Sequence, residues 1–347
     1  MSGQQLTDYL KSLPADAVSK IEFITNPSSK YDAAGSAGII NIKLKKNQAY
    51  GLNGTANIGV GVGRYGKANG GVNLNYRKDK LNLFGSSYTG YSMSYSELTL
   101  NSVLNNNGAI SFQDRNNYWH PTSIYSSYKG GADYNIGKNS TIGVLYRGSL
   151  SHTDARTDNT TTFKNVARQP TSFVQGIKND TDRVYNHFFN VNYKATLDTL
   201  GSELNIDVDY SVYKNSSADI NENYFYDGQM KTTRPAYLFR NTQPATGTIK
   251  AVKADYTRFF ANKMKLETGF KISQVNSDND LMVDSLTTAK NWQKDKNRSN
   301  HFVYDEAIYA AYANVSKTVG KTSIQAGLRA EQTNSTGNSI TINKVDK

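Results

Sequence analysis

The chain contains no cysteine among its 347 residues, and this absence excludes several kinds of structure at once. Without thiols there is no disulfide framework, no thiolate metal site and no cysteine nucleophile. No apolar run approaches the roughly 18 residues of a membrane-spanning helix. The start, MSGQQLTDYLKSLP, lacks the cationic beginning and the apolar segment of a signal peptide, so we expect an exported form to have a different true beginning.

Signatures of catalysis and metal binding are also missing. There is no G-x-S-x-G motif, and the four histidines, His120, His152, His187 and His301, are far apart and lack ligand spacing. Residues 61–66 match G-x-G-x-x-G, but a strand pattern follows them where the dinucleotide fingerprint requires a helix, so they predict a tight turn. We expect no enzyme, no cofactor and no metal.

The charge balance is basic, with 40 Lys and Arg against 29 Asp and Glu, a net charge of +11. Such a balance raises nucleic acid as a partner. The basic residues are spread over turns and strands rather than gathered in one arm, which favours a solvated surface and no nucleic-acid partner. The low mean hydropathy of -0.62 does not exclude a membrane, because outer-membrane barrels alternate lipid-facing and lumen-facing residues. The 24 tyrosines suit the aromatic girdles of such a barrel or any sheet.

Alternation of apolar and polar residues is the main pattern from Tyr50 onward. It is clearest in residues 204–212, where Leu, Ile, Val, Tyr and Val alternate with Asn, Asp, Asp and Ser. This period is typical of strands with one apolar face. We count eleven candidate strands, and because bacterial barrels normally have an even number, we expect an incomplete barrel.

Connections between these strands alternate in length. Short polar turns are predicted near residues 77–80, 137–140, 198–202, 260–263 and 318–321. Long polar segments, predicted as loops, cover residues 93–122, 153–183, 217–245 and 278–304. Short periplasmic turns and long extracellular loops are the arrangement of outer-membrane barrels.

The first 46 residues differ from the rest. Ser2 and Gln5 have capping-box spacing, which predicts a short helix that ends at Pro14. Residues 21–24 and 40–45 read as strands, and turn residues lie between them. This α/β piece is too small to hold a core alone.

Two segments resemble a known family. VSKIEFITNPSSKYDAAGSAGIINIKLKK resembles the end of the plug domain of TonB-dependent outer-membrane receptors, closest to a Bacteroidetes-type outer-membrane β-barrel family. YDEAIYAAYANVSKTVGKTSIQAGLRAEQT resembles a barrel segment of the same family. The likeness covers nearly the whole chain.

The resemblance implies an all-β fold: a transmembrane antiparallel outer-membrane β-barrel, incomplete and of about eleven strands, preceded by a small α/β plug remnant. Residues 1–47 would be the end of the plug, and residues 48–347 the first part of a barrel that has about 22 strands in the family. Such receptors bind a nutrient at extracellular loops and plug and import it with energy relayed by TonB. The partners implied are outer-membrane lipid, the TonB complex and a ligand among siderophores, glycans, peptides and cobalamin-like molecules. Because the family pattern includes a TonB box and more plug and barrel, we expect this piece alone not to transport.

Three groups of candidate site residues follow. Structural or gating candidates in the motif that joins plug and barrel are Asn26, Pro27, Tyr31, Asp32, Gly35, Gly38 and Asn41. Lumen-facing candidates are Glu203, Asp207, Asp209, Arg329 and Glu331. Extracellular ligand-loop candidates are Tyr118, Trp119, Tyr224, Tyr226 and Trp292.

Two other classes of function stay open on the residues alone. One is a structural or adhesion barrel in the outer membrane that carries out no energised uptake. The other is a soluble β-rich glycan-binding module or enzyme, which would purify as a monomer without detergent.

Overall fold

The computed structural model describes residues 18–24, 28–31, 39–44, 50–106, 108–287, 289–320 and 322–346. Near the start, β1 (Val18–Ile24) and β2 (Ile39–Leu44) pair antiparallel and form a separate two-stranded sheet, here called the N-terminal hairpin. The strands predicted over residues 21–24 and 40–45 are therefore confirmed for the described residues. The predicted helix before Pro14 lies outside the described residues.

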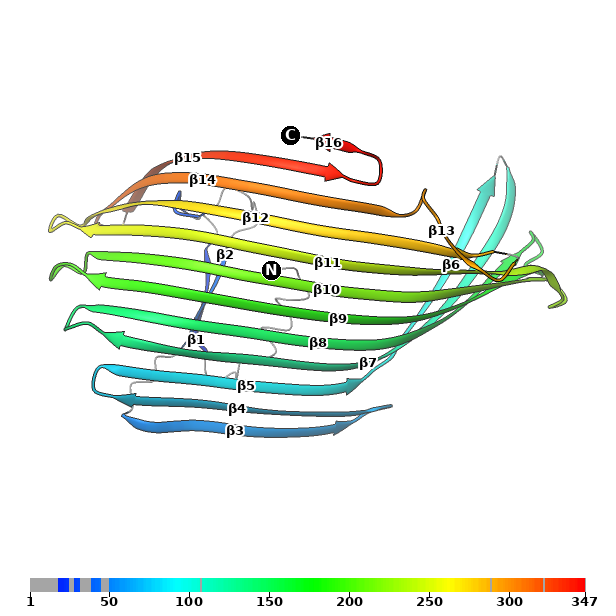
Figure 1. Cartoon of the computed structure of the whole chain (residues 1–347), viewed down its shortest axis with the longest axis horizontal. Helices are drawn as coiled ribbons and strands as arrows, with labels where there is room; N and C mark the ends of the chain where they lie inside the picture. Colours follow the sequence, from blue (N-terminus) through cyan, green and yellow to red (C-terminus); the bar gives the residue numbers. More distant parts are fainter. Residues whose placement is uncertain are drawn as a thin grey trace.

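All remaining strands belong to one large antiparallel sheet (Figure 1). They are β3 (Gly51–Val62), β4 (Gly66–Lys78), β5 (Leu81–Met93), β6 (Ser96–Asn106), β7 (Ala109–Asn135), β8 (Ser140–Lys164), β9 (Pro170–Thr196), β10 (Glu203–Asp227), β11 (Thr232–Phe259), β12 (Met264–Leu286), β13 (Trp292–Lys294), β14 (Asn300–Val319), β15 (Thr322–Ser339) and β16 (Lys344–Asp346). When the short or off-path strands β6, β13 and β16 are left out, each strand pairs with the one that follows it along the chain. Over the described residues, this meander has the eleven long strands that the alternation predicts, and the all-β fold is confirmed.

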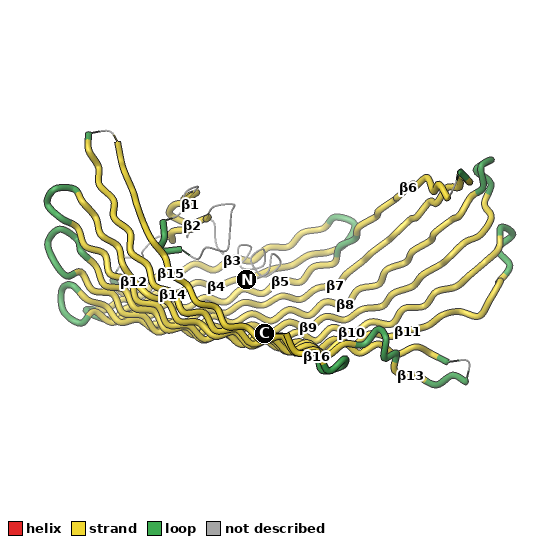
Figure 2. The backbone as a smooth tube through the Cα atoms, turned by 90° about the horizontal axis from the view of Figure 1, so that it is seen from above, coloured by secondary structure: helices red, strands yellow, loops and turns green. Residues whose placement is uncertain are grey.

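The large sheet is curved, and the N-terminal hairpin lies over its concave side (Figure 2). In Figure 1 the hairpin is seen behind the sheet, so that view faces the convex side. The strand order runs from β3 at one edge to β16 at the other, and the described strands do not close into a barrel. We find no helix in the described ranges with the length and apolar character needed to cross a membrane.

Five tight turns join the strands at one end of the sheet, and all five were predicted. They connect β4 to β5, β7 to β8, β9 to β10, β11 to β12 and β14 to β15. Each contains one residue with positive φ, namely Asp79, Gly137, Gly201, Lys263 and Gly320. A left-handed residue lets two antiparallel strands connect over a very short distance, which explains the Gly and polar residues at these positions.

The four long polar segments were predicted as loops, and this prediction is wrong. Most of their residues extend strands β6 to β12 and β14, and the connections at this end of the sheet are also short. As a result β7 to β12 have 23 to 28 residues each. About 9 to 11 residues span a bilayer. In the large sheet, here called the wall, β7 to β12 are therefore more than twice as long as a bilayer crossing requires.

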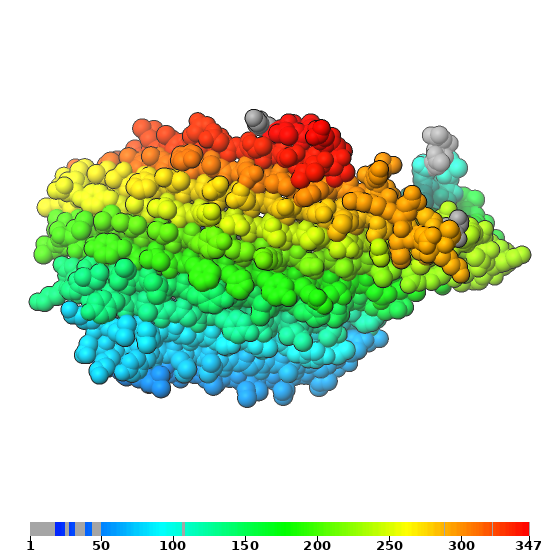
Figure 3. Space-filling model, in the orientation of Figure 1, coloured from blue at the N-terminus to red at the C-terminus, as the bar shows by residue number. Residues whose placement is uncertain are grey.

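A row of apolar side chains crosses the convex face at one level of the sheet. Ten residues paired in register from β3 to β14 form it: Leu52, Tyr76, Leu83, Ala132, Val144, Val191, Val208, Val252, Ile272 and Tyr309. Val208 is 47% exposed although it is apolar. Figure 3 shows this convex face, with consecutive strands side by side. The row and the apolar residues that flank it on the convex face of each strand are here called the apolar belt. Belts of this kind face lipid in outer-membrane barrels.

The adjacent row, on the concave face, is polar. Its paired members are Arg77, Asn82, Asp133, Gly143, Asn192, Asp207, Lys253, Lys271, Ala310 and Glu331. Successive residues of a strand point to opposite faces, so one alternating sequence builds both surfaces. The concave side is therefore the polar side, where the N-terminal hairpin lies.

A charge in the apolar belt is expected to destabilise the protein. Replacing Val208 with arginine puts a cation against lipid, which costs about 2–4 kcal/mol near the bilayer midplane. Urea unfolding in bilayers, followed by tryptophan fluorescence, measures the loss. Ser211→Arg, on the concave face of the same strand, is the matched control and is expected to cost much less. Equal losses in the two variants would contradict the assignment of faces.

Candidate functional site

A short turn of the N-terminal segment is docked on the concave face of the wall. The Tyr31 backbone N–H donates a hydrogen bond to the Ser28 carbonyl at 3.1 Å, which closes a turn over residues 28–31, here called the docking turn. Ser29 Oγ donates to the carbonyl oxygen of Ala313 on β14 at 3.2 Å. Lys30 Nζ lies 3.2 Å from Asp255 Oδ2 on β11. Two strands of the wall therefore hold the segment.

Asp255 is the centre of this contact and is only 4% exposed. Its neighbours Ala254 and Tyr256 belong to the convex alternation, so the Asp255 carboxylate points to the concave side. It accepts a hydrogen bond from Tyr312 Oη and lies 2.9 Å from Lys253 Nζ. A buried carboxylate is stable only when it is paired. Asp255 thus has two cationic partners, Lys253 from the wall and Lys30 from the docking turn.

Two glycines leave the space that these contacts need. A Cβ at Gly269 would lie 2.8 Å from the Tyr312 ring and 2.9 Å from Asp255 Oδ1. A Cβ at Gly327 would lie 2.5 Å from Ser29 Oγ. All three distances are shorter than van der Waals contact allows. The glycines therefore let Tyr312 reach the acid and let the docking turn approach β15.

A second polar group lies beside the docking turn. Asn314 is 1% exposed, and its Nδ2 donates to Glu267 Oε2 at 3.0 Å. Glu267 also lies 3.0 Å from Lys265 Nζ. The Asn314 Oδ1 atom is buried and has no hydrogen-bond partner among the described atoms. Buried unpaired acceptors are costly, so this atom offers a place for a donor from a moving segment or a ligand.

Polar side chains also form a hydrogen-bonded track across β9 and β10. Asn192 Nδ2 donates to Asn190 Oδ1 at 2.7 Å, and Asn190 Nδ2 donates to Asp209 Oδ1 at 2.7 Å and to Asp207 Oδ1 at 3.4 Å. These groups line the concave face, where water or a polar ligand can exchange hydrogen bonds with them.

The five lumen-facing candidates all lie in the concave alternation. Asp207 and Asp209 belong to the track, Glu203 lies 2.7 Å from Lys194 Nζ, and Arg329 Nη2 lies 2.7 Å from Glu331 Oε2. The structure does not bring them into one cluster. Their role in ligand passage stays a prediction.

In the N-terminal hairpin, Asn41 is one of three side chains around Glu22. Asn41 Nδ2 and Lys43 Nζ each lie 2.9 Å from a Glu22 carboxylate oxygen, and Lys20 Nζ lies at 3.0 Å. The hydrogen bond from Lys43 is the largest cause that lowers the pKa of Glu22 to about 2. This arrangement ties β1 to β2. The other motif candidates, Asn26, Pro27, Asp32, Gly35 and Gly38, lie outside the described residues.

The five ligand-loop candidates lie on strands, which corrects the loop assignment. Tyr118 and Trp119 are on β7, Tyr224 and Tyr226 on β10, and Trp292 on β13. Tyr118 Oη is 2.8 Å from Tyr65 Oη. The guanidinium carbon of Arg64 lies 5.3 Å from the Tyr118 ring centroid. Ligand binding by these residues stays a prediction.

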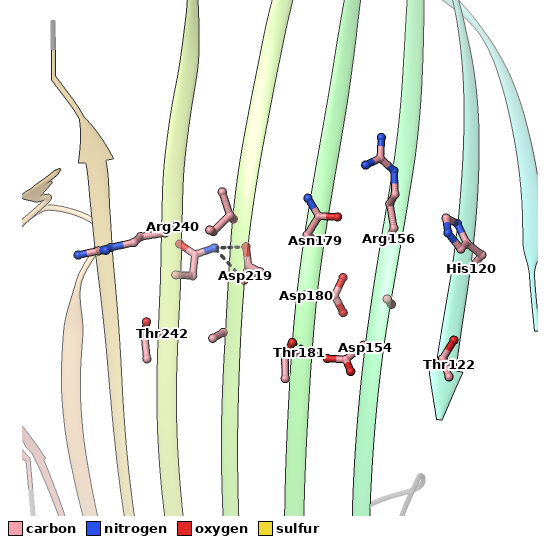
Figure 4. Close-up of a pocket in the computed structure, with 14 residues that line it drawn as sticks. His120, Thr122, Asp154, Arg156, Asn179, Asp180, Thr181, Asp219, Arg240 and Thr242 are labelled. Atoms are coloured by element: carbon pink, nitrogen blue, oxygen red, sulfur yellow. Dashed lines mark hydrogen bonds between the residues drawn. The ribbon is translucent and has the colours of Figure 1, made fainter. Parts of the chain in front are cut away.

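A groove of about 610 Å³ crosses β7 to β11 beyond the apolar belt (Figure 4). Ten of its lining residues share the alternation of the belt and therefore lie on the convex face: His120, Thr122, Asp154, Arg156, Asn179, Thr181, Ala218, Ile220, Arg240 and Thr242. The other four are Ala155, Asp180, Asp219 and Asn241, which pair with one another across β8 to β11. Each stands between two of the convex residues on its own strand. Thr181 Oγ1 donates to Asp154 Oδ1 at 2.6 Å, and this bond is the largest cause that lowers the Asp154 pKa. Within the described ranges there is no group of three His, Asp or Glu side chains suited to hold a metal.

Tyr31, which closes the docking turn, was among the candidates chosen from sequence, whereas Ser29, Lys30 and Asp255, which make the contact with the wall, were not. Ser29 and Lys30 stand inside the NPSSKYDA stretch, between residues that were chosen. Asp255 alternates inward in the same way as Asp207, so the period-two pattern could have identified it. Its pairing with Lys30 required the three-dimensional structure.

Comparison with known proteins supports the membrane assignment. Residues 195–347 match the outer membrane protein beta-barrel family, which places the protein in the cell outer membrane. No curated protein has a significant match to the chain. The crystal structure of the siderophore receptor PirA from Pseudomonas aeruginosa aligns with 94% of this chain and 88% of its own, at 8% identity and a TM-score of 0.21. A likeness this low carries no argument about fold or ligand.

Replacing Gly327 with alanine is expected to release the docking turn. The new methyl group would lie 2.5 Å from Ser29 Oγ and 2.7 Å from Asn314 Oδ1, so the docking turn has to move away and the Asn314 side chain has to adjust. We expect faster modification of Lys30 by an amine-reactive reagent, measured by mass spectrometry. Gly130→Ala, where a Cβ meets nothing within 4 Å, should leave the rate unchanged. An unchanged rate in the Gly327 variant would show that the turn is not held there.

The ion pairs of Glu22 predict how the N-terminal hairpin responds to pH. The folded pKa of about 2 lies below the ordinary value of 4.5, so the stabilisation is fully present above pH 4.5 and is lost as pH falls through about 2. NMR titration of the Glu22 carboxyl should give a midpoint near 2, which Lys43→Met should raise. A midpoint near 4.5 in the unchanged protein would mean that the hairpin ion pairs do not form in solution.

Proposed function

We propose that this chain is part of a TonB-dependent nutrient receptor of the outer membrane. In this proposal residues 48–347 form part of the barrel wall, and residues 1–47 form part of a plug that TonB displaces. The observation that carries the proposal is the docking of residues 28–31 on the concave face. A structural or adhesion barrel has no need of a segment held against its inner wall.

The chemistry of the docking contact suits a segment that moves. Among the described residues, its polar contacts with the wall are the hydrogen bond of Ser29 and the ion pair of Lys30. A hydrogen bond that is exchanged for water contributes only about 0.5–1.5 kcal/mol net, so such contacts can break without unfolding the wall. Asp255 keeps Lys253 and Tyr312 as partners after Lys30 leaves, which limits the cost of release.

The concave face also suits passage of a polar molecule. The track of Asn190, Asn192, Asp207 and Asp209 offers exchangeable hydrogen bonds along the wall. Siderophores, glycans, peptides and cobalamin-like molecules all carry the polar groups that such a surface binds. The ligand class therefore has to be found by direct assay.

A disulfide between the docking turn and the wall would test the gating role. The chain has no native cysteine, and a Cβ at position 327 would lie 3.1 Å from the Ser29 Cβ. Disulfides have Cβ atoms about 3.5–4.5 Å apart, so a small outward shift of the docking turn allows the bond. In a receptor that carries this chain together with the rest of the plug and barrel, we expect Ser29→Cys/Gly327→Cys to form this bond on oxidation and to block uptake in cells. Reduction should restore uptake. The probes are radiolabelled ferric siderophores, oligosaccharides, peptides and cobalamin, each offered with and without a protonophore.

The matched control is Thr318→Cys/Ser323→Cys, which links β14 to β15 within the wall. These side-chain oxygens lie 2.9 Å apart, and the positions pair in register. This variant should form its disulfide and keep its uptake. Uptake that persists in the locked Ser29 variant would contradict the gating role, and uptake that ignores the protonophore would favour a passive barrel.

A further inference from the structure

Three unpaired basic side chains lie on the convex face at the outer limit of the apolar belt. They are Arg183 on β9, Lys214 on β10 and Lys250 on β11, here called the basic row. On each of these strands, every second residue lies on the convex face. Counted from the apolar belt away from the five tight turns, the first charged residue on that face is Arg183, Lys214 or Lys250. All three are exposed, and none makes an ion pair in the part of the chain that the structure describes.

Two members of the row are neighbours across adjacent strands. Arg183 pairs in register with Ser216, and Lys214 stands two positions from Ser216 on the same face. Diagonal neighbours of this kind have Cβ atoms roughly 7–8 Å apart, within reach of long side chains that converge on one anion. His152, which pairs in register with Arg183 on the other side, extends the site to β8.

Aromatic side chains lie on the membrane side of Arg183 and Lys214, and one of them, Tyr210, pairs in register with Lys250. Tyr146 Oη is 2.9 Å from His187 Nδ1, and the Tyr146 and Phe189 ring centroids are 5.0 Å apart. The Phe189 and Tyr210 centroids are 6.4 Å apart. Tyrosines with an apolar body and a polar tip collect at the boundary between lipid and water. The basic row therefore lies at the level of lipid headgroups.

The nearest acid on this face does not neutralise the row by direct pairing. Asp154 accepts a hydrogen bond from Thr181 and lies 2.9 Å from His152 Nε2, and the charge of Arg183 acts on it without a direct ion pair. Beyond it lies the groove shown in Figure 4, with polar groups on both sides. Basic residues thus come first at the membrane boundary, and a polar groove follows.

We propose that the basic row binds the phosphate of an anionic lipid in the outer leaflet, with the polar part of its headgroup in the groove. A lipid chain that lies along Val212 and Tyr185 brings its phosphate to Lys214 and Arg183, because these are the next residues on the same face. A soluble phosphate has no such reason to bind at the end of an apolar belt. The site is independent of the docking turn and of any uptake function.

The test compares lipid binding by the purified full chain and by Arg183→Gln/Lys214→Gln/Lys250→Gln. Spin-labelled phosphatidylglycerol and phosphatidylcholine in equimolar nanodiscs report the lipids in contact with the protein. We expect the unchanged protein to prefer the anionic lipid, by roughly fivefold for each basic side chain near the surface. The row variant should lose this preference. Lys231→Gln/Lys290→Gln/Lys296→Gln removes the same charge from turns and should keep it.

Three outcomes would each overturn the proposal. The first two are equal binding of both lipids by the unchanged protein and an unchanged preference in the row variant. The third is displacement of the anionic lipid by inorganic phosphate in the buffer, which would identify a soluble phosphate site. Circular dichroism of each variant verifies that the strands are retained, and a row variant that loses them is replaced by the single substitution Lys214→Gln.

Discussion

The structure depends on one constraint: backbone polar groups inside a bilayer have no water and must bond to a neighbouring strand. A wall of antiparallel strands satisfies this requirement for each strand that has a neighbour on both sides, and it then forces alternate side chains to opposite faces. Ten apolar residues in one register row, among them Val144, Val208 and Ile272, follow from this on the convex side. The polar row next to it follows equally on the concave side.

The concave face collects the charges that the belt excludes, and this explains the chemistry of the docking contact. Asp255 points inward because its two neighbours face lipid, and it is buried against Tyr312 and Lys253. A mobile segment that carries a lysine can pair with such an acid without any apolar core. The same alternation, continued beyond the belt, brings the basic row and the groove to the outside of the wall.

Much of the wall could be predicted from the sequence, because period-two alternation and tight turns are local signals. The five turns, the strands and the apolar face of residues 204–212 are all of this kind. The outer halves of the strands could not be predicted in this way, because both faces there contact water and no apolar period marks them. Residues 153–164, for example, read as a polar loop but continue β8.

The candidate site was less accessible from sequence. Tyr118 and Trp119 were chosen for their chemistry and were expected on a loop, whereas pairing with β6 and β8 keeps them on a strand. Lys30 and Asp255 are far apart in the chain, and only the curvature of the sheet brings the docking turn to β11. No periodicity within either segment contains that information.

The most direct test is a spin-label accessibility scan through residues 204–220 of β10, one introduced cysteine at a time in this cysteine-free chain. The account predicts access to lipid-dissolved oxygen at even positions from Leu204 to Val212, none at the odd positions, and an end to lipid access at Lys214. Lipid access at Asp207 and Asp209, or no alternation at all, would contradict a wall with an apolar convex face and a polar concave one.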